Sequence, residues 1–560
     1  MIDAFARAAE LDAYLGRPRD ANSIMREQDS LKWDAEGTFP QPAVDALDEW
    51  GLQRAYVPKT LGGDLVDVLP AMLQIRQVAR RDITTAVAHG KTFLGSLCSW
   101  LAGGDSADLM SSIVLSGSAV SWGLTERGRG SDILRSATRY TGTKGGRLTG
   151  GKWPINNATR GRAMCVLVRT RDETSPRSLS LALVDKNESG SAGVSYAPKV
   201  RTHGVRGADI SGIDWNDVAI PNNRFIGQEG QGLELVLRAL QLTRPTCTAL
   251  SLGGADQAVD EVLRFLRHRR LYGRGLGALP KARADAGAVI ADSLVAEATA
   301  FVGARHVVEL TEEMALVSAL VKYVVPATVD SLFRDATGLL GARSQLIGVD
   351  GAGRFEKATR DSRVVGIFDG NSIVNLQVII NEFPSVTKSS GDQVDLDKML
   401  SALDAAAPTN GLMLERLRLM TRRGSTLMTA VPQLCAAVAS GVDPPLERTV
   451  EEFARGVADL MDDIRLAERT MAPGGAHFDL ARRLAEAFAG ACCLTVWSSN
   501  SAPTNLARNQ VWLAAALTRV SLRMGLHVRE AAVNDSDLYD LCAAAGSAGE
   551  PVTLFEGWVA

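Results

Sequence analysis

The segment LTERGRGSD, residues 124–132, stands where the chain changes from a helical to a strand-like pattern. Closely spaced glycines let a backbone approach an anion, so that amide N–H groups and Ser or Thr hydroxyls can bind phosphate. A loop with two glycines and a serine is more often an ordinary turn. The segment therefore indicates a phosphate-binding loop only if its position relative to later segments of the chain supports that interpretation.

Five later segments follow this loop in a fixed order. They are KWPINN at 152–157, DVAIP at 217–221 with Asn223, Gly227, Gly230 and Gly232 after it, RRLYG at 269–273, RDSR at 360–363 and FDGN at 368–371. The six segments resemble the signatures T-E-P-G-x-G-S-D, G-x-K-x-W-I-T-N, D-V-x-V-P…N…G-x-x-G-x-G, R-x-x-F-G, R-D-x-R and Y-E-G-T of the acyl-CoA dehydrogenase family. Each match is weak alone, but their order and spacing hold over residues 35–383, which makes the resemblance specific.

The resemblance implies a fold that is mainly α with an inserted β domain, and local patterns agree. Leu179, Leu181 and Leu183 alternate with small residues, which predicts a strand. Valine and leucine at 259, 262, 263 and 266 line one face of a predicted helix. We expect an N-terminal helical domain at 1–118, a middle β-barrel-like domain at 119–230, a helical bundle carrying the base and FAD contacts at 231–383, and an extra C-terminal helical domain at 384–560.

The C-terminal segment also shows helical signals. Thr449-x-x-Glu452 matches a capping box, which predicts a helix start there. An apolar stripe at helical spacing follows, formed by Val450, Phe453, Val457, Leu460 and Ile464. This long extension resembles that of the very-long-chain family members, in which it occupies the space of the second dimer of the usual tetramer. The resemblance therefore implies a homodimer.

The resemblance implies FAD as cofactor, extended between the β domain and the bundle and reaching into a neighbouring subunit. Carried over position by position, Thr125 and Ser131 would contact the flavin and the pyrophosphate. Arg269 would reach the pyrophosphate of the partner subunit's FAD, with Tyr272 nearby. Three substitutions depart from the family pattern.

These departures concern residues expected to touch the flavin. Asn156 replaces the usual Thr or Ser whose hydroxyl touches flavin N5, and Asn371 stands where the family's Thr touches FAD. Pro154 stands where the family commonly has Trp, and Trp153 is displaced by one position. We expect altered flavin contacts on this side, which leaves redox tuning and oxidase behaviour open.

Asp369 occupies the position of the family's catalytic base, although an isolated Asp before Gly is normally a turn residue. In the family's concerted reaction, a carboxylate removes the α-proton of an acyl thioester while a hydride leaves Cβ for flavin N5. A ribityl hydroxyl of FAD and the base residue's own N–H stabilise the enolate oxygen. Asp is one methylene shorter than the common Glu, about 1.5 Å less reach, but nitroalkane oxidases share this fold and use Asp there.

A second base position known in the family falls at Thr243, which cannot remove a proton. Arg244, the next residue, would approach the site as a substrate-binding residue or form a surface ion pair. The leading hypothesis is thus an FAD-dependent dehydrogenase of an acyl thioester, carried by coenzyme A or by an acyl carrier protein. An electron-transfer flavoprotein is the expected electron acceptor.

Two other classes of function remain open on the same resemblance. One is a flavin oxidase or monooxygenase, for example a nitroalkane-oxidase-like enzyme. The other is a weakly catalytic DNA-binding or partner-subunit member of the family. From residue 385 onward there are 16 Lys and Arg against 21 Asp and Glu, and this acidic balance argues against nucleic acid as a partner.

Composition narrows the remaining classes. The chain of 560 residues has a net charge of −3 and seven cysteines, none with CxxC spacing, which indicates a reduced, cytoplasmic protein. The histidines are scattered, so no metal site is expected. The most apolar stretch, residues 316–329, is interrupted by Lys322 and Pro326, so we expect no stretch that spans a membrane.

Overall fold

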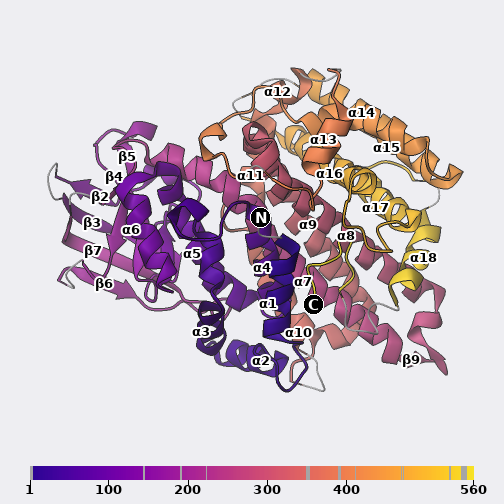
Figure 1. Ribbon diagram of the computed structural model, residues 1–560, viewed down its shortest axis with the longest axis horizontal. Helices are drawn as coiled ribbons and strands as arrows, with labels where there is room; N and C mark the ends of the chain where they lie inside the picture. Colours follow the sequence, from indigo (N-terminus) through magenta and orange to yellow (C-terminus); the bar gives the residue numbers. More distant parts are fainter. Residues whose placement is uncertain are drawn as a thin grey trace. The chain divides into compact units, whose positions relative to one another are not determined.

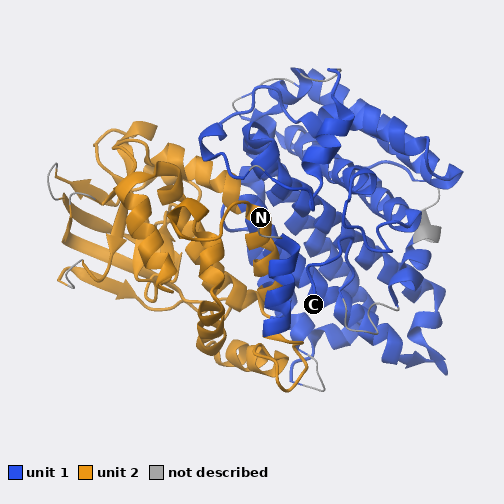
Figure 2. Cartoon of the chain, in the orientation of Figure 1, with its two compact units in different colours: residues 1–14, 79–81, 244–560 blue, residues 15–78, 82–243 orange. Residues whose placement is uncertain are grey.

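The computed structural model describes residues 4–142, 146–188, 192–221, 224–348, 353–388, 392–409, 411–467, 470, 472–528, 531–543 and 551–560. Asn223 of the predicted motif lies outside these residues. The chain divides into two compact units (Figure 2). Residues 15–78 and 82–243 form the sheet unit, and residues 1–14, 79–81 and 244–560 form the helical unit.

The sheet unit combines helices with a mixed eight-stranded sheet in the order β6-β7-β3-β2-β4-β5-β8, with β1 beside β4. Strands β1 and β2 run parallel to β4, and the other pairs are antiparallel. The helices are α2 (Glu27–Glu36), α3 (Gln41–Trp50), α4 (Val68–Ala79), α5 (Ile83–Ala102) and α6 (Gly104–Leu115), and the strands are β1 (Val120–Gly123), β2 (Arg139–Thr141), β3 (Gly146–Asn156), β4 (Ala163–Arg169), β5 (Leu179–Asp185), β6 (Val194–Ala197), β7 (Ile210–Ile220) and β8 (Phe225–Ile226).

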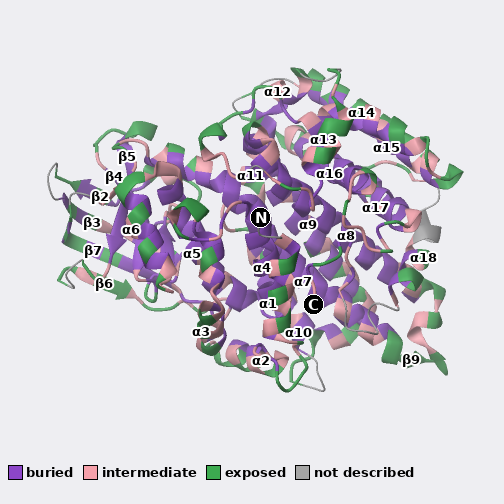
Figure 3. Ribbon diagram, viewed as in Figure 1, coloured by how far each residue is buried: buried purple, intermediate pink, exposed green. Residues whose placement is uncertain are grey.

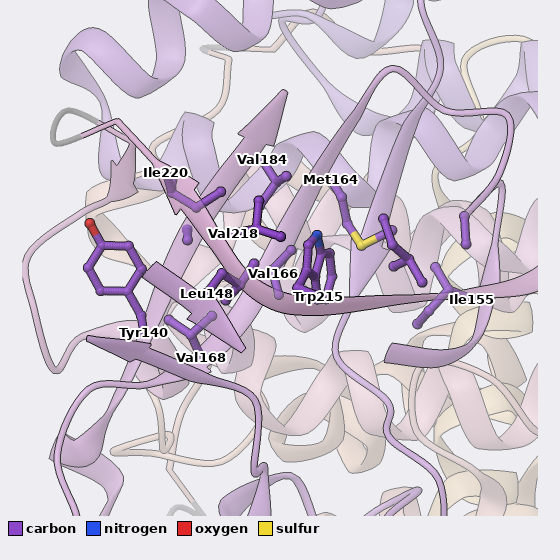
Figure 4. Packing of buried hydrophobic residues seen from close by; sticks show 13 residues of the cluster. Tyr140, Leu148, Ile155, Met164, Val166, Val168, Val184, Trp215, Val218 and Ile220 are labelled. Carbon is purple, nitrogen blue, oxygen red and sulfur yellow. The ribbon is translucent and has the colours of Figure 1, made fainter. Parts of the chain in front are cut away.

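The core of the sheet unit is a cluster of buried side chains that includes Val166, Trp215 and Tyr140 (Figure 4). The strand predicted from the alternating leucines is confirmed as β5, but its small residues are buried as well. The reason is a second covering layer. The N–H of Gly230 donates to Ser180 Oγ at 2.9 Å, and a Cβ at Gly232 would lie 2.6 Å from the Ser180 carbonyl carbon. The glycines after β8 therefore let the chain pack directly on this strand.

The helical unit contains most of the remaining helices (Figure 1). Helix α7 (Gly232–His268) begins in the sheet unit and continues into this one. The others are α1 (Ala4–Leu15), α8 (Pro280–Glu309), α9 (Met314–Leu340), α10 (Arg354–Ser362), α11 (Ser372–Asn381), α12 (Phe383–Lys388), α13 (Leu396–Leu403), α14 (Thr426–Ala439), α15 (Pro444–Leu466), α16 (Gly475–Ser498), α17 (Gln510–Arg523) and α18 (Ala531–Ala543), with a small hairpin of β9 (Arg270–Leu271) and β10 (Arg274–Gly275).

The expectation that no stretch is long and apolar enough to span a membrane needs correction at helices α8 and α9. By length and composition, the helical stretches Pro280–Glu309 and Thr311–Gln345 are both apolar enough to cross a membrane, and α9 spans the run around Lys322 and Pro326. Their most apolar windows are 100% and 78% buried inside the protein (Figure 3). Because α8 and α9 pack against each other and against the C-terminal helices, core burial accounts for their apolar character.

The C-terminal segment folds as helices that pack on α8 and α9. The predicted apolar stripe is confirmed, since all five of its residues are buried on α15. The predicted capping box is wrong. Helix α15 begins at Pro444, where Asp443 caps it by accepting from the Leu446 N–H at 3.3 Å, so Thr449 lies inside the helix. The two prolines that follow Asp443 favour this earlier start, because proline suits the first helical turn.

The architecture confirms the expected fold, mainly α with an inserted β domain. The division into four domains at residues 118, 230 and 383 stays a prediction, since the compact units follow a different boundary, within α7.

Candidate active site

Asp369 lies in a short loop between a 3-10 turn (Arg363–Gly366) and helix α11. Its φ angle is 54° and that of Gly370 is 93°, so two successive residues take the left-handed conformation. Asp adopts this region more readily than most residues, and glycine adopts it without penalty. An outlier of this kind at a half-buried carboxylate is typical of a functional loop.

Helix α11 holds the loop from its C-terminal side. Asn371 Oδ1 accepts from the Val374 N–H at 2.9 Å and so caps the helix. Asn375 Nδ2 donates to the carbonyl oxygens of Gly370 and Asn371 at 2.8 and 3.1 Å. The backbone at the base position is therefore fixed by two asparagine side chains. Asn371, expected to touch FAD, has its Oδ1 engaged in this cap.

Helix α7 brings two side chains to the Asp369 loop from positions three residues apart, hence from one helix face. Cys247 Sγ donates to Asp369 Oδ2 at 3.7 Å. The Arg244 guanidinium lies beside Gly370, where an added Cβ would be 3.3 Å from Nη2. Arg244 is only 5% exposed, so the alternative of a surface ion pair is wrong. Burial lowers the pKa of Arg244 to about 10 although Asp369 opposes the shift, and the residue stays cationic at neutral pH.

Helix α9 contributes Lys322, which the sequence interpretation treated only as an interruption of an apolar stretch. Its Nζ donates to the Phe368 carbonyl oxygen at 2.8 Å and also to that of Val365. Burial lowers the pKa of Lys322 to about 8, while Cys247 and Asp369 oppose the shift. The sequence signal that could have indicated this residue is a single lysine inside an apolar helix.

The predicted flavin-contacting loop belongs to the sheet unit, and a buried ion pair braces it. Lys152 Nζ lies 2.8 Å from Glu126 Oε1, and Lys152 is fully buried. The same carboxylate accepts from the Ser136 hydroxyl at 2.6 Å and from the backbone N–H groups of Ala137 and Thr138 at 2.7 and 3.0 Å. Burial alone would raise the pKa of Glu126, but Lys152 and these donors outweigh it and lower the pKa to about 2.

This brace predicts a specific loss of stability in acid. Because the pKa of Glu126 is lower in the folded chain than its ordinary value of 4.5, the unfolded chain takes up the proton first as the pH falls. The stabilisation, on the order of 2 kcal/mol, is present above about pH 4.5 and is lost toward pH 2. In urea unfolding, the difference in stability between wild type and Glu126→Gln should narrow over this window. The exposed pair of Glu229 with Arg171 supplies the control: Glu229→Gln should show no such narrowing, and equal behaviour of the two variants would contradict the assignment.

Gly128 and Gly130 leave the braced loop open. A Cβ at either glycine would meet nothing within 4 Å in the described chain, and Gly128 has a left-handed φ of 73°. The Thr125 carbonyl oxygen accepts from the Trp153 N–H at 3.0 Å, and the Arg127 guanidinium stacks on the Trp153 ring at 4.3 Å. Ser131 is exposed. An open glycine loop with hydroxyl groups at both ends fits the binding of a phosphate-containing cofactor such as FAD.

The other predicted contacts belong to other segments of the chain. Asn156 Nδ2 donates to the Val87 carbonyl oxygen at 3.0 Å, and its Oδ1 is buried without a hydrogen-bond partner in the described chain. Arg269 and Tyr272 lie at the end of α7 and in the β9–β10 hairpin, both exposed, with Tyr272 91% exposed. The structure therefore brings Asp369, Asn371 and Arg244 together in the helical unit, whereas Thr125, Ser131 and Asn156 belong to the sheet unit.

Family models match both parts of this arrangement. The acyl-CoA dehydrogenase middle domain matches residues 121–218, and the acyl-CoA dehydrogenase C-terminal domain matches residues 230–383. These matches span the braced loop, α7, α9 and the Asp369 loop. The chain belongs to the acyl-CoA dehydrogenase family. It is accordingly a flavoprotein oxidoreductase with FAD as its cofactor.

Individual relatives agree with this identification. The chain is 24% identical over 349 residues to a probable acyl-CoA dehydrogenase (fadE25) of Mycobacterium leprae, covering 62% of this chain and 88% of that protein. It is 28% identical over 250 residues to the mitochondrial isobutyryl-CoA dehydrogenase of Dictyostelium discoideum, covering 44% and 59%. The alignments with these two relatives therefore cover only part of this acyl-CoA dehydrogenase.

Solved structures extend the likeness in fold to the C-terminal segment. An acyl-CoA dehydrogenase complexed with FAD from Bacillus anthracis covers 98% of this chain and 95% of its own, with a TM-score of 0.73 at 17% identity. Butyryl-CoA dehydrogenase from Megasphaera elsdenii covers 67% of this chain and 96% of its own, with a TM-score of 0.59 at 20% identity. The extension after residue 384 is thus a fold shared with at least one other family member.

Proposed function

We propose that this acyl-CoA dehydrogenase catalyses the FAD-dependent α,β-dehydrogenation of an acyl thioester, with Asp369 as the base that removes the α-proton. The observation that carries the proposal is the placement of Asp369. Its half-buried carboxylate sits in a left-handed loop and accepts from a thiol, and a buried guanidinium lies beside the next residue, Gly370. A base must be fixed within hydrogen-bond reach of the proton that it removes, and this loop supplies such fixation.

Two neighbouring residues on α7 support a base that is held in place. Arg244 carries a positive charge next to the loop, and Cys247 donates to one carboxylate oxygen. Both side chains help to hold the Asp369 loop in place, which a base needs if it is to meet the proton that it removes. The other carboxylate oxygen remains for the substrate. Arg244 thus acts on the base, and a direct contact with the substrate stays a proposal.

The backbone at Asp369 supports the second half of the chemistry. Within the described residues, the N–H groups of Asp369 and Gly370 have no hydrogen-bond acceptor. Such donors can stabilise the negative charge that develops on the thioester oxygen when the α-proton leaves. FAD, when bound, supplies the acceptor for the hydride that leaves Cβ. The shorter reach of Asp relative to Glu would be compensated by the position of this fixed backbone.

The wider setting is proposed on the same basis. An acyl-CoA is the expected substrate, with an acyl carrier protein as alternative carrier, and an electron-transfer flavoprotein is the expected acceptor. A solved structure of the electron transferring flavoprotein of Acidaminococcus fermentans includes a chain that shares the fold, with a TM-score of 0.60 at 17% identity. The exposed hairpin with Tyr272 suits a homodimer contact. All seven cysteines are buried and free, which supports a reducing, cytoplasmic location.

The test is the visible spectrum of the purified FAD-loaded protein during anaerobic addition of butyryl-, isobutyryl-, octanoyl-, palmitoyl- and cyclohexanecarbonyl-CoA. At least one thioester should bleach the flavin and produce the 2-enoyl thioester in equal amount. If none does, the same acyl groups should be presented on acyl carrier protein. Failure of both sets of thioesters would overturn the proposal.

An oxidase is the second candidate, favoured by one observation. The residue at the proposed base position is Asp rather than Glu, as in nitroalkane oxidases. A prolyl acyl carrier protein oxidase also shares the fold, with a TM-score of 0.61 at 16% identity. Admitting air to the reduced protein separates the two functions. An oxidase regains its flavin colour within seconds and forms hydrogen peroxide, whereas a dehydrogenase with bound product reoxidises slowly.

A further inference from the structure

Lys322 is a cation in surroundings that disfavour one. It is 1% exposed near the middle of α9, and its neighbours Val321, Val324 and Val325 are at most 1% exposed. Placing an ammonium group in such surroundings is costly unless its donors are satisfied. Both of its protein acceptors in the described chain, the carbonyl oxygens of Val365 and Phe368, belong to the segment that leads into Asp369. The cost is thus met by contacts to this one segment.

The Phe368 carbonyl is half of the peptide group whose other half is the Asp369 N–H. A trans peptide is planar, so its N–H points away from its carbonyl oxygen. A hydrogen bond of 2.8 Å from Lys322 Nζ to that oxygen therefore fixes the direction of the Asp369 N–H. The positive charge also polarises the peptide, which makes this N–H a stronger donor. The same N–H has no acceptor within the described residues.

We propose that Lys322 is a positioning residue for α-proton abstraction: by holding the Phe368–Asp369 peptide, it directs the Asp369 N–H at the thioester oxygen while the Asp369 carboxylate faces the α-carbon. The inference rests on the proposed function and deepens it. One buried amine would align both the base and the donor that stabilises the enolate. Lys322 acts through the backbone and touches neither substrate nor cofactor.

The charged and titratable groups around Lys322 shift its pKa and so set the pH at which it loses its proton. Arg244 and Cys247 face it from α7, and Asp369 faces it from the loop. Burial lowers its pKa to about 8, with Cys247 and Asp369 opposing the shift and Arg244 adding to it. Lys322 is thus largely protonated at pH 7 and loses its charge as the pH rises through about 8. The polarisation of the peptide should weaken over the same range.

The test compares anaerobic flavin reduction by the most active acyl-CoA in wild type, Lys322→Met, Lys322→Arg and Leu332→Ala. Leu332 is fully buried on the same helix, so its truncation controls for a weakened α9. Lys322→Met should lower the limiting reduction rate about 100-fold, the loss typical of one oxyanion donor, with substrate affinity within about threefold. Leu332→Ala should lower Tm and leave the reduction rate at 15 °C within about twofold.

The pH profile separates positioning from mere structural support. The wild-type reduction rate should fall as the pH rises through about 8, where Lys322 loses its proton. Lys322→Arg should lack this fall, because a guanidinium does not titrate there. This comparison remains decisive even if Lys322→Met fails to fold. It uses FAD-loaded protein throughout.

The outcomes distinguish this inference from the proposed function. If no thioester reduces the wild-type flavin, the proposed function fails and the role of Lys322 falls with it. If wild type reacts but Lys322→Met matches Leu332→Ala in rate, or Lys322→Arg keeps the fall above pH 8, the positioning role is overturned and the function stands. A loss of affinity without loss of limiting rate would also contradict positioning.

Discussion

Asp369→Asn should leave FAD bound and lower the rate of flavin reduction by an acyl thioester about 10³-fold or more. The amide keeps the shape of the side chain but cannot accept a proton, and general base catalysis contributes up to about 10⁴-fold. Stopped-flow absorbance at the flavin band, under anaerobic conditions with saturating acyl-CoA, gives the rate directly. The unchanged visible spectrum of the resting protein would show that FAD is retained.

Two variants control this result. Asp397→Asn removes an exposed carboxylate on α13 and should leave the rate unchanged. Asp369→Glu extends the carboxylate by about 1.5 Å in a loop built for Asp, so its rate should lie between those of wild type and Asp369→Asn. A rate for Asp369→Asn within tenfold of wild type would rule out Asp369 as the base.

Asp292→Ala should lower the free energy of unfolding by about 3–5 kcal/mol. Asp292 is fully buried on α8, and it pairs with Arg519 and Arg523 of α17 at 2.6 Å each. Burial alone would raise the pKa of Asp292, but the two arginines lower it overall. Removing the carboxylate leaves two largely buried guanidinium groups with less compensation, and this cost is the physical reason for the large effect. Urea unfolding followed by circular dichroism measures it.

A second carboxylate that pairs with Arg519 offers a matched control. Asp335 of α9 also pairs with Arg519, at 2.7 Å, but it is 36% exposed. Water can replace an exposed partner, so Asp335→Asn should cost below about 1 kcal/mol. If the two variants lose equal stability, the ion network around Asp292 does not attach the C-terminal helices to α8 in the way described.

Much of the fold could be predicted from the sequence because its signals are local. Apolar spacing located α15, and alternating leucines located β5. The start of α15 was mispredicted because Thr449 and Glu452 satisfy the capping pattern equally well inside a helix, and Asp443 with two prolines provides the better start. Periodicity also could not show that β5 is covered on both faces, since this depends on a distant glycine segment.

Residues of the candidate site could be predicted only at positions that match a known motif of the family or stand beside one. Asp369 and Asn371 were found from the order of short segments, and Arg244 from its place beside Thr243, the second base position of the family. The structure brings the three residues together. Cys247 and Lys322 belong to no sequence motif. Lys322 on α9 donates to the carbonyl oxygen of Phe368, 46 residues later, and such a contact leaves no local pattern in the sequence. A buried lysine gives a compositional hint, but its partner becomes visible only in three dimensions.

The most direct test of the central claim compares flavin bleaching by an acyl-CoA and by the same compound with both α-hydrogens replaced by deuterium. Proton abstraction by Asp369 predicts bleaching in wild type that deuterium slows severalfold, and bleaching that is about 10³-fold slower in Asp369→Asn. Equal rates with both compounds, together with an Asp369→Asn rate near that of wild type, would contradict the account.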